Sequence, residues 1–268
     1  MDISGVALIT GAASGIGAAT AIALARDGCS GLALADINEE SISKVMSQVQ
    51  ALGLPKQPRI HSYVLDVTDE KAVDRIVAEV AQAFGRIDYL VNAAGIAKKV
   101  PGGAAFTSTP DWQRVIDVNL TGSFFVLRAA AQVMLKQSPL LSTIDGRELQ
   151  RGSIVNFASI LGAVGVPMTT AYTASKHGVL GLTKTASEDY AAKGLRINAI
   201  CPGYTETPMT MGNELVRDVM AEKVQKDVPM RRMGKPQEIA DGVVYLCGGR
   251  SSFVTGTGLF VDGGYTQR

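Results

Sequence analysis

Thr10-Gly11-Ala12-Ala13-Ser14-Gly15-Ile16-Gly17 is the stretch of sequence that decides the fold. It directly follows the apolar run Val6–Ile9, and the helix-forming residues Ala18–Arg26 come next. Glycine permits a tight turn and a close approach of the backbone to a ligand, and a helix N-terminus offers unpaired N–H groups and the positive end of a dipole. The pattern therefore predicts a strand, a turn that binds a diphosphate, and a helix. A turn without a ligand is the plainer alternative, because G-x-x-x-G-x-G differs from the common G-x-G-x-x-G fingerprint.

The rest of the chain repeats this alternation of short apolar runs and segments with helical spacing. Further strands are predicted at Leu32–Ala35, Ile60–Leu65, Tyr89–Ala93, Ser153–Ala158, Arg196–Cys201 and Leu259–Val261. Further helices are predicted at Glu39–Leu52, Glu70–Phe84, Trp112–Lys136, Ala171–Ala192, Leu215–Lys226 and Pro236–Leu246. Strands that are apolar throughout are covered on both faces, which is typical of a parallel sheet. We expect an α/β fold with a doubly wound parallel sheet of about seven strands and helices on both faces.

The chain shows no shift in composition that would mark a domain boundary, so we expect residues 1–268 to form a single domain. Ser138–Gly152 is polar and contains a proline and two glycines, which predicts an extended surface loop. Residues 203–227 begin with several Thr, Met and Pro residues and lie beyond the end of a predicted strand. Ligands bind beyond the carboxyl ends of strands in such sheets, so this segment is a candidate substrate lid.

Composition argues against several classes of protein. The formal net charge is +1 over 268 residues, so neither nucleic acid nor a membrane surface is an expected partner. The N-terminus lacks the features of a signal peptide, and no stretch is long and apolar enough to span a membrane. Three well-separated cysteines and two distant histidines predict no disulfide framework and no metal site. We expect a cytoplasmic protein in a reducing compartment.

An acidic residue ends the second predicted strand. Asp36 lies 19 residues beyond Gly17, and a carboxylate at this place can accept hydrogen bonds from both ribose hydroxyls of an adenosine. It would also repel a 2′-phosphate, and neither Ser14 nor Ile37 supplies a compensating positive charge. The expected cofactor is therefore NAD rather than NADP. A solvated turn residue is the alternative for Asp36.

Four polar residues suggest acid–base chemistry. Tyr172 and Lys176 are four positions apart at the start of a predicted helix, so they share one helix face. A free tyrosine has a pKa of about 10, and a nearby cation would lower the pKa of Tyr172 toward neutrality. Ser159 ends the fifth predicted strand and can orient a substrate oxygen, whereas Asn119 can hold a water that links Lys176 to solvent. Each residue alone is commonplace, but their order behind a dinucleotide turn predicts a catalytic site.

Taken together, these motifs resemble the short-chain dehydrogenase/reductase family over almost the whole chain. The resemblance rests on T-G-x-x-x-G-x-G at 10–17, Asp66, Asn92-Ala93-Ala94-Gly95, Asn119, Ser159, Tyr172-x-x-x-Lys176, Pro202-Gly203 and Val261-Asp262-Gly263-Gly264. One mild departure is Ala93, where many members have a second asparagine or a cysteine. The resemblance implies a Rossmann-type sheet and association as a homo-oligomer, more often a tetramer than a dimer, through the helices at 112–136 and 171–192 and the C-terminal segment.

The resemblance also implies roles for individual residues. Tyr172 would be the general acid/base, Lys176 would bind the nicotinamide ribose, Ser159 would hold the reacting oxygen, and Asn119 would complete a proton relay. The expected cofactor-binding residues are Gly11, Ser14, Gly15, Ile16, Gly17, Asp36, Ile37, Asp66, Val67, Asn92, Ala93, Gly95, Val118, Tyr172, Lys176, Pro202, Gly203, Thr205 and Thr207.

The expected substrate pocket is apolar and adaptable. Its candidates are Ile96, Ile160, Leu161, Val164, Val166, Met168, Tyr204, Met209, Met211 and Leu215. We therefore expect an NAD(H)-dependent oxidoreductase that interconverts a secondary alcohol and a ketone on a largely apolar molecule, which is steroid-, terpenoid- or polyketide-like or alicyclic. Oxidation is the favoured direction, because cells usually keep the NAD pool oxidised.

Two alternatives stay open at this point. The first is a reductase of 3-oxoacyl groups on acyl-carrier protein, which Asp36 opposes because such enzymes usually prefer NADPH, and for which Arg231-Arg232 is the only candidate docking patch. The second is a protein that binds NAD without transferring hydride, or that has been repurposed. The intact set of Asn, Ser, Tyr and Lys argues against it.

Overall fold

The computed structural model describes residues 1–212 and 214–267, and within 214–219 it describes the backbone alone. Leu215, expected in the substrate pocket, therefore lies outside the described side chains. In the described part of the chain, seven parallel strands form one sheet in the order β3-β2-β1-β4-β5-β6-β7. The strands are β1 (Val6–Thr10), β2 (Gly31–Asp36), β3 (Arg59–Val64), β4 (Tyr89–Asn92), β5 (Gly152–Phe157), β6 (Leu195–Pro202) and β7 (Gly258–Val261). The predicted doubly wound parallel sheet is confirmed.

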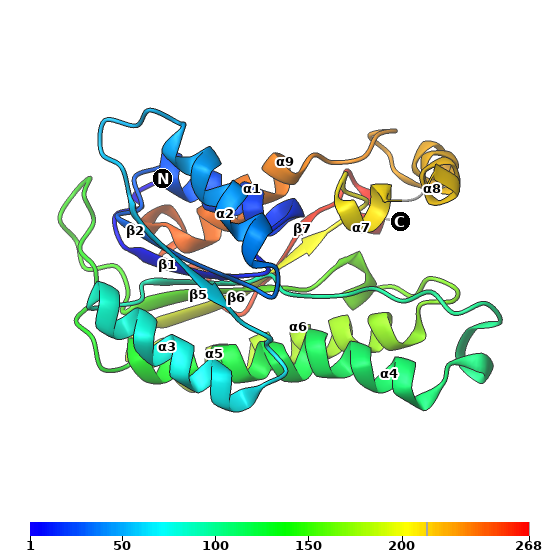
Figure 1. Ribbon diagram of the computed structural model, residues 1–268, viewed down its shortest axis with the longest axis horizontal. Coiled ribbons are helices and arrows are strands. Elements are labelled where there is room, and N and C mark those ends of the chain that lie inside the picture. The colour runs from blue at the N-terminus through cyan, green and yellow to red at the C-terminus, as the bar shows by residue number, and fades with distance from the viewer. Residues whose placement is uncertain (213, 268) are drawn as a thin grey trace.

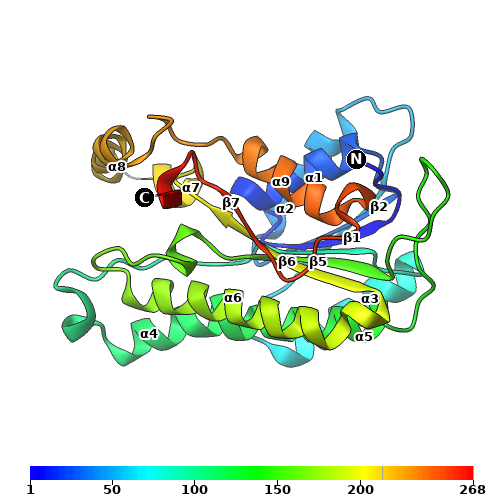
Figure 2. The same cartoon turned by 180° about the vertical axis from the view of Figure 1, so that it is seen from behind.

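Helices cover both faces of the sheet (Figure 1). The α-helices are α1 (Gly15–Arg26), α2 (Glu39–Gln50), α3 (Glu70–Phe84), α4 (Thr109–Ile116), α5 (Gly122–Met134), α6 (Thr170–Tyr190), α7 (Pro208–Met211), α8 (Glu214–Asp227) and α9 (Pro236–Cys247). One layer contains α1, α2 and α9, and the other contains α3, α4, α5 and α6. The helices α7 and α8 lie beyond the end of the sheet, as the view from behind also shows (Figure 2).

The sheet lies between two apolar layers because each helix turns one apolar stripe inward. On α3, Val73, Ile76, Val77 and Val80 are all buried. This helix begins where the Asp69 side chain accepts a hydrogen bond from the amide of Ala72, and it ends at a left-handed glycine. The central strands β1, β4 and β5 are buried at every position. Polar residues that could form a functional site therefore lie at the end of the sheet and not on its faces.

The single helix predicted at Trp112–Lys136 is wrong in one respect. A π-helical turn at Asp117–Thr121 separates α4 from α5. The hydroxyl of Ser123 donates to the carbonyl of Asn119 at 2.7 Å. That side-chain bond competes with the regular backbone ladder at this turn, which is a physical reason for the interruption.

The segment Ser138–Gly152 is more ordered than the predicted surface loop. Leu141 and Glu148 form an antiparallel bridge, so the segment folds back as a short hairpin. Its tip is attached to the N-terminus, because Asp2 Oδ1 accepts hydrogen bonds from both the amide and the hydroxyl of Thr143, at 2.9 and 2.7 Å. The other predicted elements agree with the structure to within three residues at each end.

No helix among the described residues is long and apolar enough to cross a membrane.

Candidate active site

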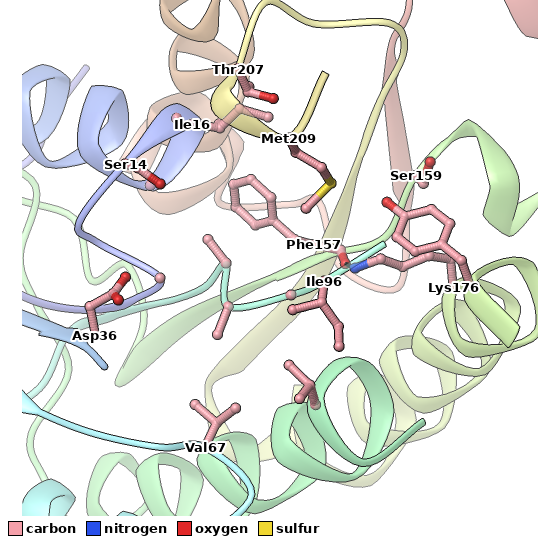
Figure 3. A pocket seen from close by; sticks show the side chains of 18 of the residues that line it. Ser14, Ile16, Asp36, Val67, Ile96, Phe157, Ser159, Lys176, Thr207 and Met209 are labelled. Carbon is pink, nitrogen blue, oxygen red and sulfur yellow. Dashed lines mark hydrogen bonds between the residues drawn. The ribbon is translucent and has the colours of Figure 1, made fainter. Parts of the chain in front are cut away.

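A cavity of about 910 Å³ lies at the carboxyl ends of the central strands. It brings together the glycine-rich turn, the end of β2, the loops after β3 and β4, the end of β5, the start of α6 and the segment after β6 (Figure 3). The predicted residues that line it are Gly11, Ser14, Gly15, Ile16, Gly17, Asp36, Ile37, Asp66, Val67, Ala93, Gly95, Ile96, Val118, Ser159, Tyr172, Lys176, Pro202, Gly203, Thr205, Thr207 and Met209. Residues far apart in the sequence thus form one continuous wall.

The glycine-rich turn has the geometry that a diphosphate requires. Gly11 has a φ of +67°, and a Cβ at Gly17 would lie 2.1 Å from the carbonyl oxygen of Gly11. No side chain larger than hydrogen fits at either position without moving the backbone. The side chain of Ser14 does not cap α1, which leaves the first amide groups of the helix directed to the cavity. This turn therefore fits the diphosphate of a dinucleotide.

Asp36 is fixed at one end of the cavity. Its Oδ2 accepts a hydrogen bond from the amide of Ala13 at 3.0 Å, and its Oδ1 accepts one from the amide of Asn38 at 3.1 Å. The neighbouring side chain of Ile37 is 70% exposed and apolar. Because a carboxylate oxygen has two lone pairs, each oxygen of Asp36 can still accept a hydroxyl donor.

Asp66 and Val67 form the next part of the wall. Asp66 Oδ1 accepts hydrogen bonds from the amide and the hydroxyl of Thr68, at 2.9 and 2.8 Å. Val67 packs against Gly122 so closely that a Cβ there would lie 2.7 Å from Val67 Cγ2. Val67 thus gives this part of the wall an apolar surface beside the carboxylate of Asp66, which suits an adenine ring.

Ser159 and Tyr172 lie together at the opposite end of the cavity. Ser159 follows β5, and its hydroxyl accepts a hydrogen bond from the amide of Leu161 at 3.1 Å. Tyr172 lies in the first turn of α6, and its phenol forms a hydrogen bond with the side chain of Ser159. Burial raises the pKa of Tyr172, and a hydrogen bond with Ser159 partly offsets this rise. The pKa of Tyr172 is thus raised, opposite to the net lowering expected from the sequence, because desolvation of the phenolate is the larger effect.

Lys176 is buried beside the tyrosine. Its Nζ donates a hydrogen bond to the carbonyl of Phe157 at 2.7 Å and lies 5.5 Å from the centroid of the Tyr172 ring. Burial lowers the pKa of Lys176 to about 8, because an ammonium group loses hydration there. The cation is thus held in place by the end of β5.

Asn119 lies behind the cavity wall, not on its surface. Its Oδ1 accepts a hydrogen bond from the amide of Ile96 at 2.8 Å, and its Nδ2 donates to the carbonyl of Ile96 at 2.9 Å. A Cβ built on Gly95 would lie 3.3 Å from Asn119 Oδ1 and 3.6 Å from Lys176 Nζ. The asparagine oxygen and the lysine nitrogen therefore both lie on the side of Gly95 to which a Cβ would point. The predicted water that links Lys176 to solvent stays a prediction.

Asn92 does not reach the cavity either. Its Nδ2 donates to the carbonyl of Ser123 at 2.8 Å, and its Oδ1 accepts from the hydroxyl of Thr10 at 3.2 Å. The residue is fully inside the sheet. It ties β1 and β4 to α5.

The predicted substrate pocket is only partly assembled. Ile96 and Met209 line the cavity (Figure 3). The others with described side chains do not line it, and they are Ile160, Leu161, Val164, Val166, Met168, Tyr204 and Met211. Ile160 is 2% exposed because the short turn after Ser159 points it into the core. Tyr204 packs edge-on against Tyr265 with ring centroids 5.6 Å apart.

Sequence reasoning missed one wall of the cavity. Pro110, Gln113, Arg114 and Asp117 line it from α4 and the π turn. Their spacing of three, four and seven places them on one helix face, so the signal was present in the sequence. The side chain of Phe157 also lines the cavity, although the apolar run that contains it predicts a residue inside a buried strand.

Comparison with known proteins agrees with this geometry. Residues 11–266 match the family model described as enoyl-(acyl carrier protein) reductase. The short-chain dehydrogenase fogB of Aspergillus ruber is 40% identical over 268 residues, which covers 99% of this chain and 98% of that protein.

Two further relatives carry more specific names. The 3-oxoacyl-[acyl-carrier-protein] reductase FabG of Thermotoga maritima is 40% identical over 97% of this chain and 96% of its own length. The cyclohexanol dehydrogenase of an Acinetobacter species is 39% identical over 98% of this chain and 95% of its own length. Taken with the sheet and the site, these matches show that the chain belongs to the short-chain dehydrogenase/reductase family of oxidoreductases, which bind nicotinamide cofactors.

Proposed function

We propose that the protein is an NAD(H)-dependent dehydrogenase that oxidises a secondary alcohol to a ketone on a largely apolar, alicyclic substrate. The observation that carries the proposal is that Ser159 and Lys176 lie at one end of the cavity and Asp36 lies at the other (Figure 3). Tyr172 lies beside Lys176 and forms a hydrogen bond with Ser159. The first end suits proton transfer at an alcohol, and the end with Asp36 suits an unphosphorylated adenosine ribose.

The cofactor preference rests on Asp36. Two backbone amides orient its carboxylate, so it is ready to accept the ribose hydroxyls without further ordering. A 2′-phosphate at this place would lie beside a fixed negative charge with no cation from Ser14 or Ile37 to offset it. NAD is therefore preferred over NADP.

The chemistry of the protein's own groups follows from their positions. A bound nicotinamide supplies the acceptor for the hydride. Ser159 holds the substrate oxygen, and Tyr172 takes the hydroxyl proton as the alcohol is oxidised, or returns a proton to the oxygen in the reverse direction. Burial raises the pKa of Tyr172, and the hydrogen bond with Ser159 acts in the opposite direction, toward the phenolate that acts as base.

The substrate class rests on the side chains next to the catalytic groups. Ile96, Phe157 and Met209 line the same cavity (Figure 3), and none of the three carries a charge. Residues 203–227, which include α7 and α8, serve as a lid over this end. An alicyclic alcohol fits such a wall, and the similarity to a cyclohexanol dehydrogenase supports the choice.

Reduction of acyl groups on acyl-carrier protein is the second candidate, and the similarity to FabG favours it. Two features weigh against it. Asp36 opposes the phosphorylated cofactor, and the candidate docking patch is engaged within the chain. Arg232 forms a bidentate ion pair with Glu238 at 2.7 Å, and Arg231 donates to the carbonyl of Gln225.

The protein is further proposed to assemble as a homotetramer through the layer that contains α5 and α6. Phe124 on α5 is 41% exposed, and Arg128 lies 5.5 Å over its ring. An exposed aromatic ring of this kind is typical of an interface.

The test is a steady-state assay of the full chain in both directions. Cyclohexanol and larger alicyclic alcohols are assayed with NAD⁺ or NADP⁺, and a 3-oxoacyl thioester is assayed with NADH or NADPH. Absorbance of the reduced nicotinamide reports turnover. The proposal predicts alcohol oxidation with a kcat/KM for NAD⁺ at least about tenfold above that for NADP⁺. Turnover confined to the thioester with NADPH would support the second candidate.

A further inference from the structure

Ser175 lies between the two catalytic residues of α6 and has no exposed surface. Its hydroxyl donates a hydrogen bond to the backbone carbonyl of Tyr172 at 2.7 Å and accepts one from Asn119 Nδ2 at 3.1 Å. It therefore joins the π turn at Asp117–Thr121 to the first turn of the helix that carries Tyr172 and Lys176.

The direction of these bonds has a consequence for Asn119. The single proton of the Ser175 hydroxyl is committed to the Tyr172 carbonyl, so the oxygen can only accept from Asn119. The amide nitrogen of Asn119 must then face Ser175, which is the same orientation that its two bonds with the backbone of Ile96 require. On this side, Asn119 Oδ1 and Lys176 Nζ lie 3.3 and 3.6 Å from the position that a Cβ on Gly95 would occupy.

We propose that Ser175 is a positioning residue for the reaction, which fixes the amide of Asn119 toward Lys176 and holds the π turn against the turn that carries Tyr172. This inference rests on the proposed function. Ser175 does not touch the cavity, because it is fully buried and does not contribute to the cavity wall. Its influence must therefore pass through Asn119 and Tyr172.

The variant Ser175→Ala removes both bonds while almost preserving volume. The amide of Asn119 then keeps only its two bonds to Ile96, and the first turn of α6 loses its link to the π turn. We expect the phenol of Tyr172 to lose its alignment with Ser159, which is the hydrogen bond that lowers the pKa of Tyr172. The pKa of Tyr172 should therefore rise in this variant, and the rise should move the pH profile of kcat to higher pH.

The chain offers a matched control on the same helix. Ser187 is 3% exposed, and its hydroxyl donates to the carbonyl of Lys184 at 2.7 Å. This is the same bond to the residue three positions earlier that Ser175 makes with Tyr172, but it lies outside the cavity wall. Ser187→Ala should reproduce any general effect of losing such a bond from α6.

The experiment compares the full-length wild type with Ser175→Ala, Ser187→Ala, Asn119→Ala and the double variant Asn119→Ala/Ser175→Ala. We measure kcat and KM for NAD⁺ as a function of pH. Ser175→Ala should lower kcat about tenfold, as loss of alignment does in other sites. The apparent pKa of the catalytic base in the pH profile of kcat should rise, and KM for NAD⁺ should stay within about twofold of the wild type. Ser187→Ala should leave kcat, this apparent pKa and KM unchanged.

A second readout does not depend on turnover. The titration of the Tyr172 phenol is followed by absorbance, as the difference between each protein and the same protein with Tyr172→Phe. If the wild type lacks turnover, the proposed function fails and this titration alone decides the role of Ser175. The proposal predicts an upward shift of the midpoint in Ser175→Ala and none in Ser187→Ala.

Two outcomes would overturn the inference. One is a kcat and a phenol midpoint in Ser175→Ala that match those of Ser187→Ala. The other is independent behaviour in the double variant, in which the losses from Asn119→Ala and Ser175→Ala multiply.

Discussion

The ammonium group of Lys176 lies 5.5 Å from the centre of the Tyr172 ring, and both groups are on the first two turns of α6. Burial favours the neutral form of each group. It therefore lowers the pKa of Lys176 and raises the pKa of Tyr172. Together they would form an ion pair that relieves part of this cost. The arrangement explains why a buried lysine that pairs with no carboxylate among the described side chains is placed here.

Lys176 should leave a pH-dependent signature in stability. Its pKa is about 8 in the folded protein and about 10.4 when unfolded. The unfolded state therefore binds more protons between these values, so the wild type should gain stability relative to Lys176→Met as pH rises from about 8 to 10.4. We expect a relative gain of about 1–3 kcal/mol, measured by urea unfolding of both proteins at pH values across this window. An equal difference at every pH would contradict the assigned pKa.

Asp36 should control the choice of cofactor. In Asp36→Ala the fixed negative charge is lost, so kcat/KM for NADP⁺ should rise and that for NAD⁺ should fall. The ratio should change by about a hundredfold, or about 2.7 kcal/mol. Asp66→Asn is the matched control, since it alters the wall next to the adenine and should weaken both cofactors equally. An unchanged ratio in Asp36→Ala would show that another residue selects the cofactor.

Gly17 should tolerate no side chain. A Cβ there would lie 2.1 Å from the carbonyl oxygen of Gly11, so Gly17→Ala must displace the turn that binds the diphosphate. We expect binding of NADH, followed by its fluorescence, to weaken at least about tenfold. Gly181→Ala is the control, because its Cβ would meet no atom within 4 Å. This exposed helical position should gain about 0.5–1 kcal/mol of stability, and NADH affinity should not change.

Arg196 lies near the start of β6, at the end of the sheet opposite the cavity, and it should be essential for the stability of the protein. Its buried guanidinium donates to the carbonyls of Cys247, Gly248 and Val254, at 3.0, 3.3 and 3.2 Å. Two of these carbonyls end α9, where the negative end of the helix dipole stabilises a cation. Arg196→Met would leave the acceptors unpaired and should lower the free energy of unfolding by about 2–4 kcal/mol.

The control for Arg196 is Arg250→Met, which replaces an exposed arginine that lies between the acceptor residues Gly248 and Val254 in the chain. It should stay within about 0.5 kcal/mol of the wild type. Chemical denaturation of the three proteins makes the comparison. Equal stability of both variants would refute the role of Arg196.

Local patterns in the sequence were sufficient for the sheet and for most of the site. The apolar runs predict the strands because a buried parallel strand needs apolar side chains on both faces. The positions of Asp36, Ser159 and Tyr172 follow from strand and helix ends, since the carboxyl ends of parallel strands meet at one edge. The structure places these three residues in one cavity.

Features that depend on contacts between distant segments were not predictable. The π turn arises where Asn119 bonds to Ile96 and where Ser123 bonds to Asn119, and periodicity does not encode such bonds. The tip of the hairpin at 138–152 bonds to Asp2, which lies 141 positions before Thr143 in the chain. The pKa of Tyr172 depends on burial, which a spacing of four residues from Lys176 does not reveal.

The most direct test of the central claim is the rate of NAD⁺ reduction with cyclohexanol by the wild type and by Tyr172→Phe, with NADH affinity measured on both. The phenol is the acid/base, so its removal should lower kcat by about a thousandfold or more, while NADH affinity should stay within about twofold. Turnover by Tyr172→Phe at a rate near that of the wild type, with NADH bound normally, would contradict the account.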